Sequence, residues 1–197
     1  MEDKQKTKKL VVLISGNGSN LQAIIDAIER HELAAKILAV ISNQREAFGL
    51  KRAEDHQLSH HTFPYGKKLS RQDYDAKLAE LVLSYQPDYV VLAGWLRLLS
   101  MAFLRHFPKR VINLHPAKPN TFPGLHAIER AFEAYQQGKI TETGVMVHFV
   151  PDEGVDDGPV ILWEKVAIYP SDDVDVLRAR IRQVEHQLLI QSLRQLP

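Results

Sequence analysis

Short apolar runs alternate along the chain with longer segments in which apolar residues recur at helical spacing. Leu10–Ile14, Ile37–Ile41 and Tyr89–Leu92 are continuous apolar runs, which is typical of strands buried on both faces of a parallel sheet. Val111–His115 is a further short strand whose last residues are polar. Apolar residues that recur every three or four positions predict five helices. The first begins at 19, the next three cover 46–56, 70–85 and 127–137, and the last begins at 172 or 173.

The order of these elements predicts the fold class. Two more strands are expected over 143–150 and 160–166, and strands alternate with helices through most of the chain. This order predicts an α/β protein with three αβα layers around a mostly parallel central sheet. The sequence has no internal repeat, low-complexity tract or long linker. Residues 1–197 are therefore expected to form one domain, with the charged segment 1–9 as a disordered tail.

Composition and charge narrow the classes of function. The 25 Lys and Arg nearly balance the 24 Asp and Glu, so the net charge of +1 gives no electrostatic argument for nucleic acid or an anionic membrane. There is no Cys, which excludes disulfides and thiolate chemistry. No apolar run approaches the ~20 residues of a membrane helix, and the charged start does not resemble a secretory signal. We expect a cytoplasmic protein, monomeric or homodimeric, that acts on small molecules.

A glycine-rich turn, Ser15–Asn20, follows the first strand. Ser19 and Gln22 have the spacing of a capping box, so the next helix is expected to start there. Backbone N–H groups in such a turn, together with the helix dipole, favour a phosphate. Leu21 stands where a dinucleotide-binding motif has its third Gly, and the second strand ends in Ser42-Asn43 rather than in an acidic residue. A single phosphate is therefore favoured over NAD, and a turn without a ligand is the alternative.

Two polar side chains stand at the end of the strand Val111–His115. Because side chains alternate along a strand, Asn113 and His115 share one face, roughly 7 Å apart at about 3.3 Å of rise per residue. Pro116 has no N–H and ends the strand. An amide donor beside an imidazole can stabilise an oxyanion and move a proton, which suits acyl transfer. Two polar residues that only face solvent are the alternative interpretation.

Three other features are ambiguous from composition alone. The apolar segment Ala93–Leu99 follows a strand end and could form the wall of a ligand pocket or part of the core. Arg71 and Arg97 could contact a ligand or be surface charges. No metal site is expected, because the spacing of a helical zinc motif is absent from the candidate histidines His115, His126 and His148.

Six motifs in order resemble the phosphoribosylglycinamide formyltransferases, the folate-dependent enzymes of purine synthesis. The motifs are Ser15–Gln22, Ala93–Arg97, Asn113–Pro116, Phe122–His126, Val147–Val150 and Asp156–Ile161. The Asn-x-His-Pro motif and the later Asp are shared by the wider formyltransferase superfamily, whereas the glycine-rich turn is specific to this branch. The resemblance implies the formyltransferase fold with a Rossmann-like N-terminal half. It also implies transfer of the formyl group of 10-formyltetrahydrofolate, the co-substrate, to the amino group of glycinamide ribonucleotide (GAR).

The same resemblance implies a catalytic trio. Asn113 would donate a hydrogen bond to the tetrahedral oxyanion, and an imidazolium at His115 would stabilise it. Asp156 would orient His115 and assist proton transfer from the amine to the folate nitrogen.

The resemblance further implies two sets of substrate contacts. On the GAR side, Gly18, Ser19 and Asn20 would hold the phosphate, Glu185 would contact the ribose, and Arg182 would add charge near the phosphate. On the folate side, Asn113 would contribute again, together with Arg71 near the glutamate tail and Leu96, Arg97, Leu98 and Leu99 around the pterin.

The chain departs from the family pattern after Pro116. Lys118 replaces an apolar residue and Asn120 replaces a residue that is often Gly, so substrate fit or loop mobility could differ. Two other functions keep part of the pattern. A 10-formyltetrahydrofolate hydrolase (deformylase) would use the same trio without needing the phosphate turn, and a non-catalytic folate- or nucleotide-binding module would not need the trio.

Overall fold

The computed structural model of the protein describes residues 7–66 and 69–197. Within them, one seven-stranded sheet has the order β3-β2-β1-β4-β5-β6-β7. The strands are β1 (Lys8–Ile14), β2 (Ala35–Ser42), β3 (His60–Thr62), β4 (Tyr89–Leu92), β5 (Val111–His115), β6 (Glu142–Phe149) and β7 (Val160–Ala167). The helices are α1 (Ser19–Glu29), α2 (Phe48–Asp55), α3 (Arg71–Ser84), α4 (Met101–Leu104), α5 (Ala127–Gln136) and α6 (Val174–Gln195).

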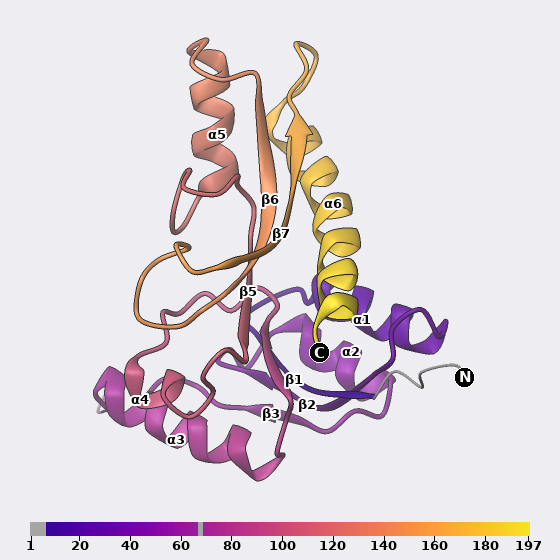
Figure 1. Cartoon of the computed structure of the whole chain (residues 1–197), viewed down its shortest axis with the longest axis vertical. Helices are drawn as coiled ribbons and strands as arrows, with labels where there is room; N and C mark the ends of the chain where they lie inside the picture. Colours follow the sequence, from indigo (N-terminus) through magenta and orange to yellow (C-terminus); the bar gives the residue numbers. More distant parts are fainter. Residues whose placement is uncertain (1–6, 67–68) are drawn as a thin grey trace.

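The sheet is parallel from β3 through β5, and β6 and β7 are antiparallel to their neighbours. Figure 1 shows β6 and β7 extending away from the parallel strands, with α6 running back from them toward α1. The strand order reverses between β1 and β4, and in open α/β sheets ligands bind outside the carboxyl ends of the strands at such a point. The turn after β1 and the segment after β4 both lie there.

Alternating side chains of the buried strands form a core on each face of the sheet, which confirms the three-layer α/β prediction. On one face, Leu10, Val12 and Ile14 of β1 pack with apolar residues of α1 and α6. On the other face, Val11 and Leu13 pack with Tyr74, Leu78 and Val82 of α3 and with the aromatic residues of the α4 region. This two-sided burial explains the continuous apolar runs, because every residue of Leu10–Ile14 and Tyr89–Leu92 is buried.

Most predicted elements are confirmed, and their ends shift by a few residues. The tail expected over 1–9 lies mostly outside the described residues, but Lys8 and Lys9 already belong to β1, so that part of the prediction is wrong. The second helix begins at Phe48 instead of 46. The last helix is capped by Asp173, whose side chain accepts hydrogen bonds from the N–H groups of Asp175 and Val176. In the described part of the chain, no helix is long and apolar enough to cross a membrane.

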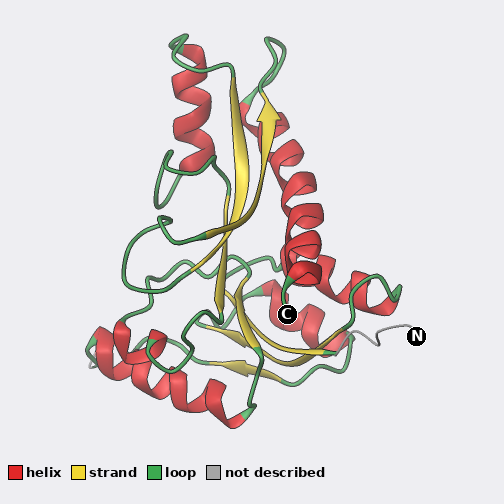
Figure 2. Cartoon of the chain, viewed as in Figure 1, coloured by secondary structure: helices red, strands yellow, loops and turns green. Residues whose placement is uncertain are grey.

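Two long loops lie side by side where β5 meets β6. One is the loop 116–126 between β5 and α5, and the other is the loop 150–159 between β6 and β7 (Figure 2). They are joined by a hydrogen bond of 2.8 Å from the N–H of Gly124 to Oδ2 of Asp156. This contact brings the late acidic motif to the end of β5, where Asn113 and His115 stand.

Candidate active site

The glycine-rich turn after β1 is built around a close contact between two backbones. Gly18 has φ 74°, and a Cβ added to it would lie 2.7 Å from Cα of Gly49, the second residue of α2. Gly18 is also the N-cap of α1, and no side chain caps this helix. The predicted capping box is therefore wrong, because Ser19 is already the first helical residue. The first N–H groups of α1 still follow directly after the turn, and such groups favour an anion.

Arg52 of α2 holds this turn from outside. Its guanidinium donates to the carbonyl oxygen of Asn17 at 3.0 Å, to Oδ1 of Asn17 at 3.2 Å and to Oε1 of Gln22 at 3.1 Å. The sequence analysis did not identify Arg52, because a lone Arg on an exposed helix carries no pattern that links it to a turn 35 residues earlier. The contacts fix the turn and place one positive charge beside it.

A pocket of about 560 Å³ lies at the carboxyl ends of β4 and β5. The predicted site residues that line it are Asn20, Leu96, Arg97, Leu98, Leu99, Asn113, His115, Asp156 and Glu185. Gly18, Arg71 and Arg182 do not line it, and Ser19 lines a neighbouring cavity of about 470 Å³ between α1, α2 and α6. The structure therefore brings together the trio, one residue of the glycine-rich turn and the apolar segment after β4.

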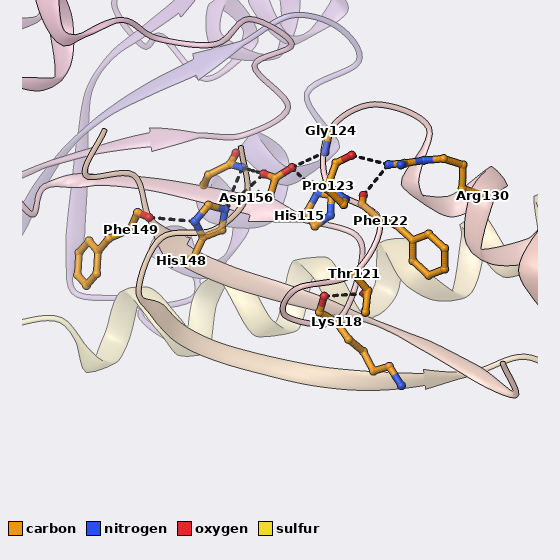
Figure 3. A network of polar contacts seen from close by, with 11 residues as sticks. His115, Lys118, Thr121, Phe122, Pro123, Gly124, Arg130, His148, Phe149 and Asp156 are labelled. Atoms are coloured by element: carbon orange, nitrogen blue, oxygen red, sulfur yellow. Dashed lines mark hydrogen bonds and ion pairs between the residues drawn. The ribbon is translucent and has the colours of Figure 1, made fainter. Parts of the chain in front are cut away.

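Asp156 is the centre of the polar network in this pocket (Figure 3). Oδ1 accepts a hydrogen bond of 2.9 Å from Nδ2 of Asn113. Oδ2 accepts the N–H of Gly124 and lies 3.1 Å from Nδ1 of His115. Asp156 adopts a left-handed backbone conformation with φ 54°, which is uncommon for a residue other than Gly. The predicted trio is thus in direct contact, and the loop backbone is bent to achieve it.

Burial and charge act in opposite directions on this pair. Burial alone raises the pKa of Asp156, but hydrogen bonds from His148 and Gly124 and the nearby imidazoles outweigh it, so the pKa of Asp156 lies below its ordinary value. Burial lowers the pKa of His115, and the negative charge of Asp156 only partly offsets this effect. The resting site therefore holds a carboxylate beside a neutral imidazole that becomes easier to protonate when a further negative charge develops.

His148 completes the network and was not predicted as a site residue. Its Nε2 lies 3.2 Å from Nδ2 of Asn113 and 3.5 Å from Oδ1 of Asp156. Because side chains alternate along β6, His148 faces away from Val145 and Val147. What the sequence could not indicate is that β6 pairs antiparallel with β5, so that His148 stands opposite Asn113.

The loop 116–126 contains the two departures from the family pattern, and both have a local explanation. Lys118 Nζ lies 3.3 Å from Oε1 of Glu142 on β6, and its Cγ would meet a Cβ added to Gly144. The side chain of Lys118 therefore lies along β6 and does not line the pocket. Asn120 has φ 63°, a conformation that Gly and Asn adopt more readily than other residues. The substitution of Asn for Gly thus preserves the backbone of the loop.

Arg130 of α5 holds the second half of this loop. Its Nη2 donates to the carbonyl oxygens of Phe122 and Pro123, both at 2.6 Å (Figure 3). Phe122 has φ 49°, an unfavourable conformation for a residue other than Gly, so this segment needs such support. The Gly124 N–H that binds Asp156 follows directly after the two carbonyl groups that Arg130 fixes.

At the other end of the pocket, Glu185 of α6 faces Asn20 of α1. Burial raises the pKa of Glu185 to about 7, although a hydrogen bond with Asn20 and the charge of Arg182 act in the opposite direction. Oδ1 of Asn20 is buried and has no hydrogen-bond partner among the described residues. A protonatable carboxyl group and an unpaired amide oxygen can both bind hydroxyl groups of a ligand.

Part of the apolar segment after β4 forms a wall of the pocket, and part belongs to the hydrophobic core. Leu96 and Leu98 are 68% and 50% exposed, whereas Leu99 is buried among the residues of α3 and α4. The guanidinium of Arg97 lies over the ring of Tyr65, 3.9 Å from its centroid. Within the described residues, no cluster of three or more His, Cys, Asp or Glu side chains has the arrangement of a metal site.

Comparison with known protein families gives one decisive match. The family model described as formyl transferase matches residues 8–193. The chain belongs to the formyl transferase family. The matched range includes the sheet described above and the three contacting residues Asn113, His115 and Asp156 of this formyl transferase.

Three similar proteins match this formyl transferase over most of their own length. The phosphoribosylglycinamide formyltransferase of Schizosaccharomyces pombe is 46% identical over 199 residues, covering 95% of this chain and 96% of that protein. The enzyme of the same name from Escherichia coli is 45% identical over 179 residues, and the match covers 91% of this chain and 82% of that protein. The crystal structure of glycinamide ribonucleotide transformylase 1 from Symbiobacterium toebii is similar with a TM-score of 0.89 and 38% identity. The match covers 95% of this chain and 86% of that chain.

Proposed function

We propose that this formyl transferase transfers the formyl group of 10-formyltetrahydrofolate to the amino group of GAR, giving formyl-GAR and tetrahydrofolate in purine synthesis. The observation that carries the proposal is that one pocket of about 560 Å³ joins Asn20 and Glu185 to Asn113, His115 and Asp156. The names of relatives up to 46% identical support formyl transfer to GAR. We further propose that residues 1–197 act as one domain, as a monomer or homodimer in the cytoplasm.

The GAR end of the pocket is proposed at the glycine-rich turn. The phosphate would bind the N–H groups of Gly18, Ser19 and Asn20, where the dipole of α1 favours an anion. Glu185 would accept or donate a hydrogen bond to the ribose, since its pKa of about 7 makes both protonation states accessible. Arg182, exposed one helical turn before, would add a positive charge near the phosphate. Arg52, which already fixes Asn17, would act in the same direction.

The folate end is proposed at the segment after β4. Leu96 and Leu98 expose apolar surface toward the pocket, and a flat pterin ring would cover it. Arg97 lines the same pocket with its guanidinium already stacked on Tyr65, so its charge is held in place. Arg71, the expected contact of the glutamate tail, lies just outside the pocket and forms an ion pair with Glu153.

The chemistry follows from the contacts around Asp156. The amine of GAR attacks the formyl carbon, a C–N bond forms, and the electron pair of the C=O bond moves to oxygen. Nδ2 of Asn113, which contacts Asp156 and His148 in the resting site, turns one N–H group to this oxyanion, and the developing negative charge favours the protonated form of His115. The oxyanion then collapses and the bond to folate N10 breaks. The amine loses one proton and N10 gains one, and the ionised Asp156 assists this transfer through water.

A spectrophotometric assay tests the proposal. Formation of tetrahydrofolate from 10-formyltetrahydrofolate is measured with and without GAR, and formyl-GAR is identified by mass spectrometry. We expect turnover only when GAR is present. Turnover at the same rate without GAR would identify a deformylase that uses the same trio. The absence of turnover from folded protein under both conditions would contradict the proposal.

A further inference from the structure

Glu153 stands between the pocket and Arg71. It belongs to the loop 150–159, three residues before Asp156, and it lines the pocket, whereas Arg71 does not. One carboxylate oxygen, Oε1, accepts the N–H of Met101 at 2.8 Å. The other oxygen, Oε2, forms an ion pair with Nη2 of Arg71. The carboxylate of Glu153 therefore joins the Arg71 guanidinium to the lining of the pocket.

The groups that hold Glu153 make a complete carboxylate site. Arg71 is the first residue of α3, and its side chain is 37% exposed. Behind it, Nε lies 4.0 Å from Oδ2 of the buried Asp75. Asp75 in turn accepts the N–H of Ser100 at 2.6 Å, directly before Met101. The guanidinium and the Met101 N–H are thus fixed relative to each other by one buried side chain, and together they bind both oxygens of a carboxylate.

The substrate of the proposed function carries a carboxylate at the matching end. The formyl group reacts beside Asp156, and the glutamate of the folate lies at the opposite end of that molecule. Leu96 and Leu98 line the same pocket as Asp156 and Glu153. A ligand whose formyl group reaches the trio and whose ring covers these leucines would bring its glutamate to the mouth, where Glu153 is bound.

We propose that Glu153 is an internal substitute for the glutamate carboxylate of the folate substrate. This inference rests on the proposed function and adds a determinant of specificity to it. Glu153 occupies Arg71 and the Met101 N–H in the unliganded enzyme, and the substrate carboxylate displaces it. The Met101 N–H has a single hydrogen and cannot bind both carboxylates at once, so Glu153 weakens the binding of folates that carry glutamate and leaves folates without it unaffected. Exposed ion pairs of this kind are weak, which makes the exchange easily reversible.

The variant Glu153→Gln tests this competition. Its KM is measured for 10-formyltetrahydrofolate and for 10-formyltetrahydropteroate, which lacks the glutamate. Removing an exposed competing ion pair is expected to lower KM about two- to fivefold for the first substrate and to leave KM for the second unchanged, with kcat unchanged for both. Glu164→Gln is the matched control, because Glu164 is exposed on β7 and its replacement changes the net charge equally.

A second variant separates competition from a purely structural role. In the background of Arg71→Gln, the effect of Glu153→Gln on KM is expected to disappear, because the two residues act through one contact. A loss of kcat with both substrates, or the same change in KM with and without Arg71, would overturn the proposal. Dissociation constants of tetrahydrofolate and tetrahydropteroate, from quenching of Trp fluorescence, give the same comparison without turnover. A failure of GAR-dependent turnover would thus count against the proposed function, while unchanged binding ratios would count against Glu153.

Discussion

Asn113 and His148 stand opposite each other on the antiparallel strands β5 and β6, with 3.2 Å between Nδ2 and Nε2. Nδ1 of His148 lies 2.9 Å from the carbonyl oxygen of Phe149, an acceptor, so Nδ1 carries a proton. Nε2 therefore faces the amide of Asn113 and also lies 3.5 Å from Oδ1 of Asp156. Since the same amide also binds Asp156, the orientation of Asn113 is fixed from both sides.

Asp156→Asn is expected to preserve the fold and to lower kcat. The amide keeps the shape of the side chain but removes the charge that favours protonated His115, and the loss is expected to be about 10²–10³-fold. KM for GAR is expected to change little, because Glu185 and the glycine-rich turn remain. Steady-state kinetics and circular dichroism check both parts.

Asp157→Asn is the control for this loss. Asp157 lies in the same loop and is exposed, so its replacement changes the net charge equally without touching the network. A soluble Asp156→Asn protein that turns over near the wild-type rate would eliminate the proposed role of Asp156.

Arg130→Gln is expected to slow catalysis although Arg130 lies outside the pocket. The change removes the hydrogen bonds to Phe122 and Pro123, and the Gly124 N–H that binds Asp156 loses its support. A hydrogen bond to a charged group contributes about 1.5–3 kcal/mol, so the expected decrease in kcat is roughly tenfold or more. The lower arm of the pH profile is expected to move to higher pH, because Asp156 loses a contact that lowers its pKa.

Two comparison variants show whether Arg130 acts through the loop. Arg130→Lys keeps the charge and one donor, and it is expected to recover part of the rate. Arg178→Gln removes a surface ion pair with Glu129 and is expected to leave the pH profile unchanged. An Arg130→Gln protein that is only less stable, with an unchanged pH profile, would point to a structural role alone.

The sequence predicted the parallel half of the sheet well because its strands are buried on both faces and have continuous apolar runs. β3 and α4 were missed, since three and four residues are too few for any periodicity. The capping box at Ser19 was wrong for a physical reason. α1 begins at Ser19 as predicted, but its N-cap is Gly18, whose backbone approaches Gly49, and no local pattern records a contact with a residue 31 positions later.

The candidate site could be predicted only where its residues lie on one element or carry a family motif. Asn113 and His115 share a strand face, so their proximity follows from periodicity. His148, Arg130 and Glu153 reach the site through strand pairing and loop contacts that depend on the whole fold. Whether Arg71 is open or covered depends on an ion pair between segments 82 residues apart, which no spacing rule describes.

Gly18→Ala is expected to damage the GAR site and the fold together. The new Cβ would lie 2.7 Å from the backbone of Gly49, at a residue with φ 74°. Strain and displacement of the turn are expected to cost roughly 2–4 kcal/mol and to raise KM for GAR at least tenfold, with KM for the folate unchanged.

Gly138→Ala separates strain from contact. Gly138 has φ 70°, but a Cβ there would meet nothing within 4 Å. This variant is expected to lose only about 1 kcal/mol and to keep the wild-type KM for GAR. Urea unfolding and kinetics of both variants test the comparison, and equal losses from the two would show that the contact with Gly49 is unimportant.

Glu185→Gln is expected to stabilise the unliganded protein above neutral pH. Burial raises the pKa of Glu185 from 4.5 to about 7 in the folded state. Below pH 4.5 the carboxyl group is protonated in both the folded and the unfolded state, so its ionisation does not change the free energy of unfolding. Between pH 4.5 and 7 the unfolded chain ionises while the folded protein does not, so the free energy of unfolding falls as pH rises. Above pH 7 both states are ionised, and the full penalty remains.

The variant removes this penalty, because Gln stays neutral and can still bind Asn20. Its free energy of unfolding is expected to exceed that of the wild type by roughly 1–3 kcal/mol at pH 8 and to match it near pH 4.5. Urea titrations at the two pH values measure the difference, with Glu164→Gln as an exposed control. The same variant is expected to raise KM for GAR, since the proposed ribose contact loses its carboxylate. A variant that is less stable at pH 8 would mean that ionised Glu185 is well stabilised in the fold, and that burial does not control its pKa.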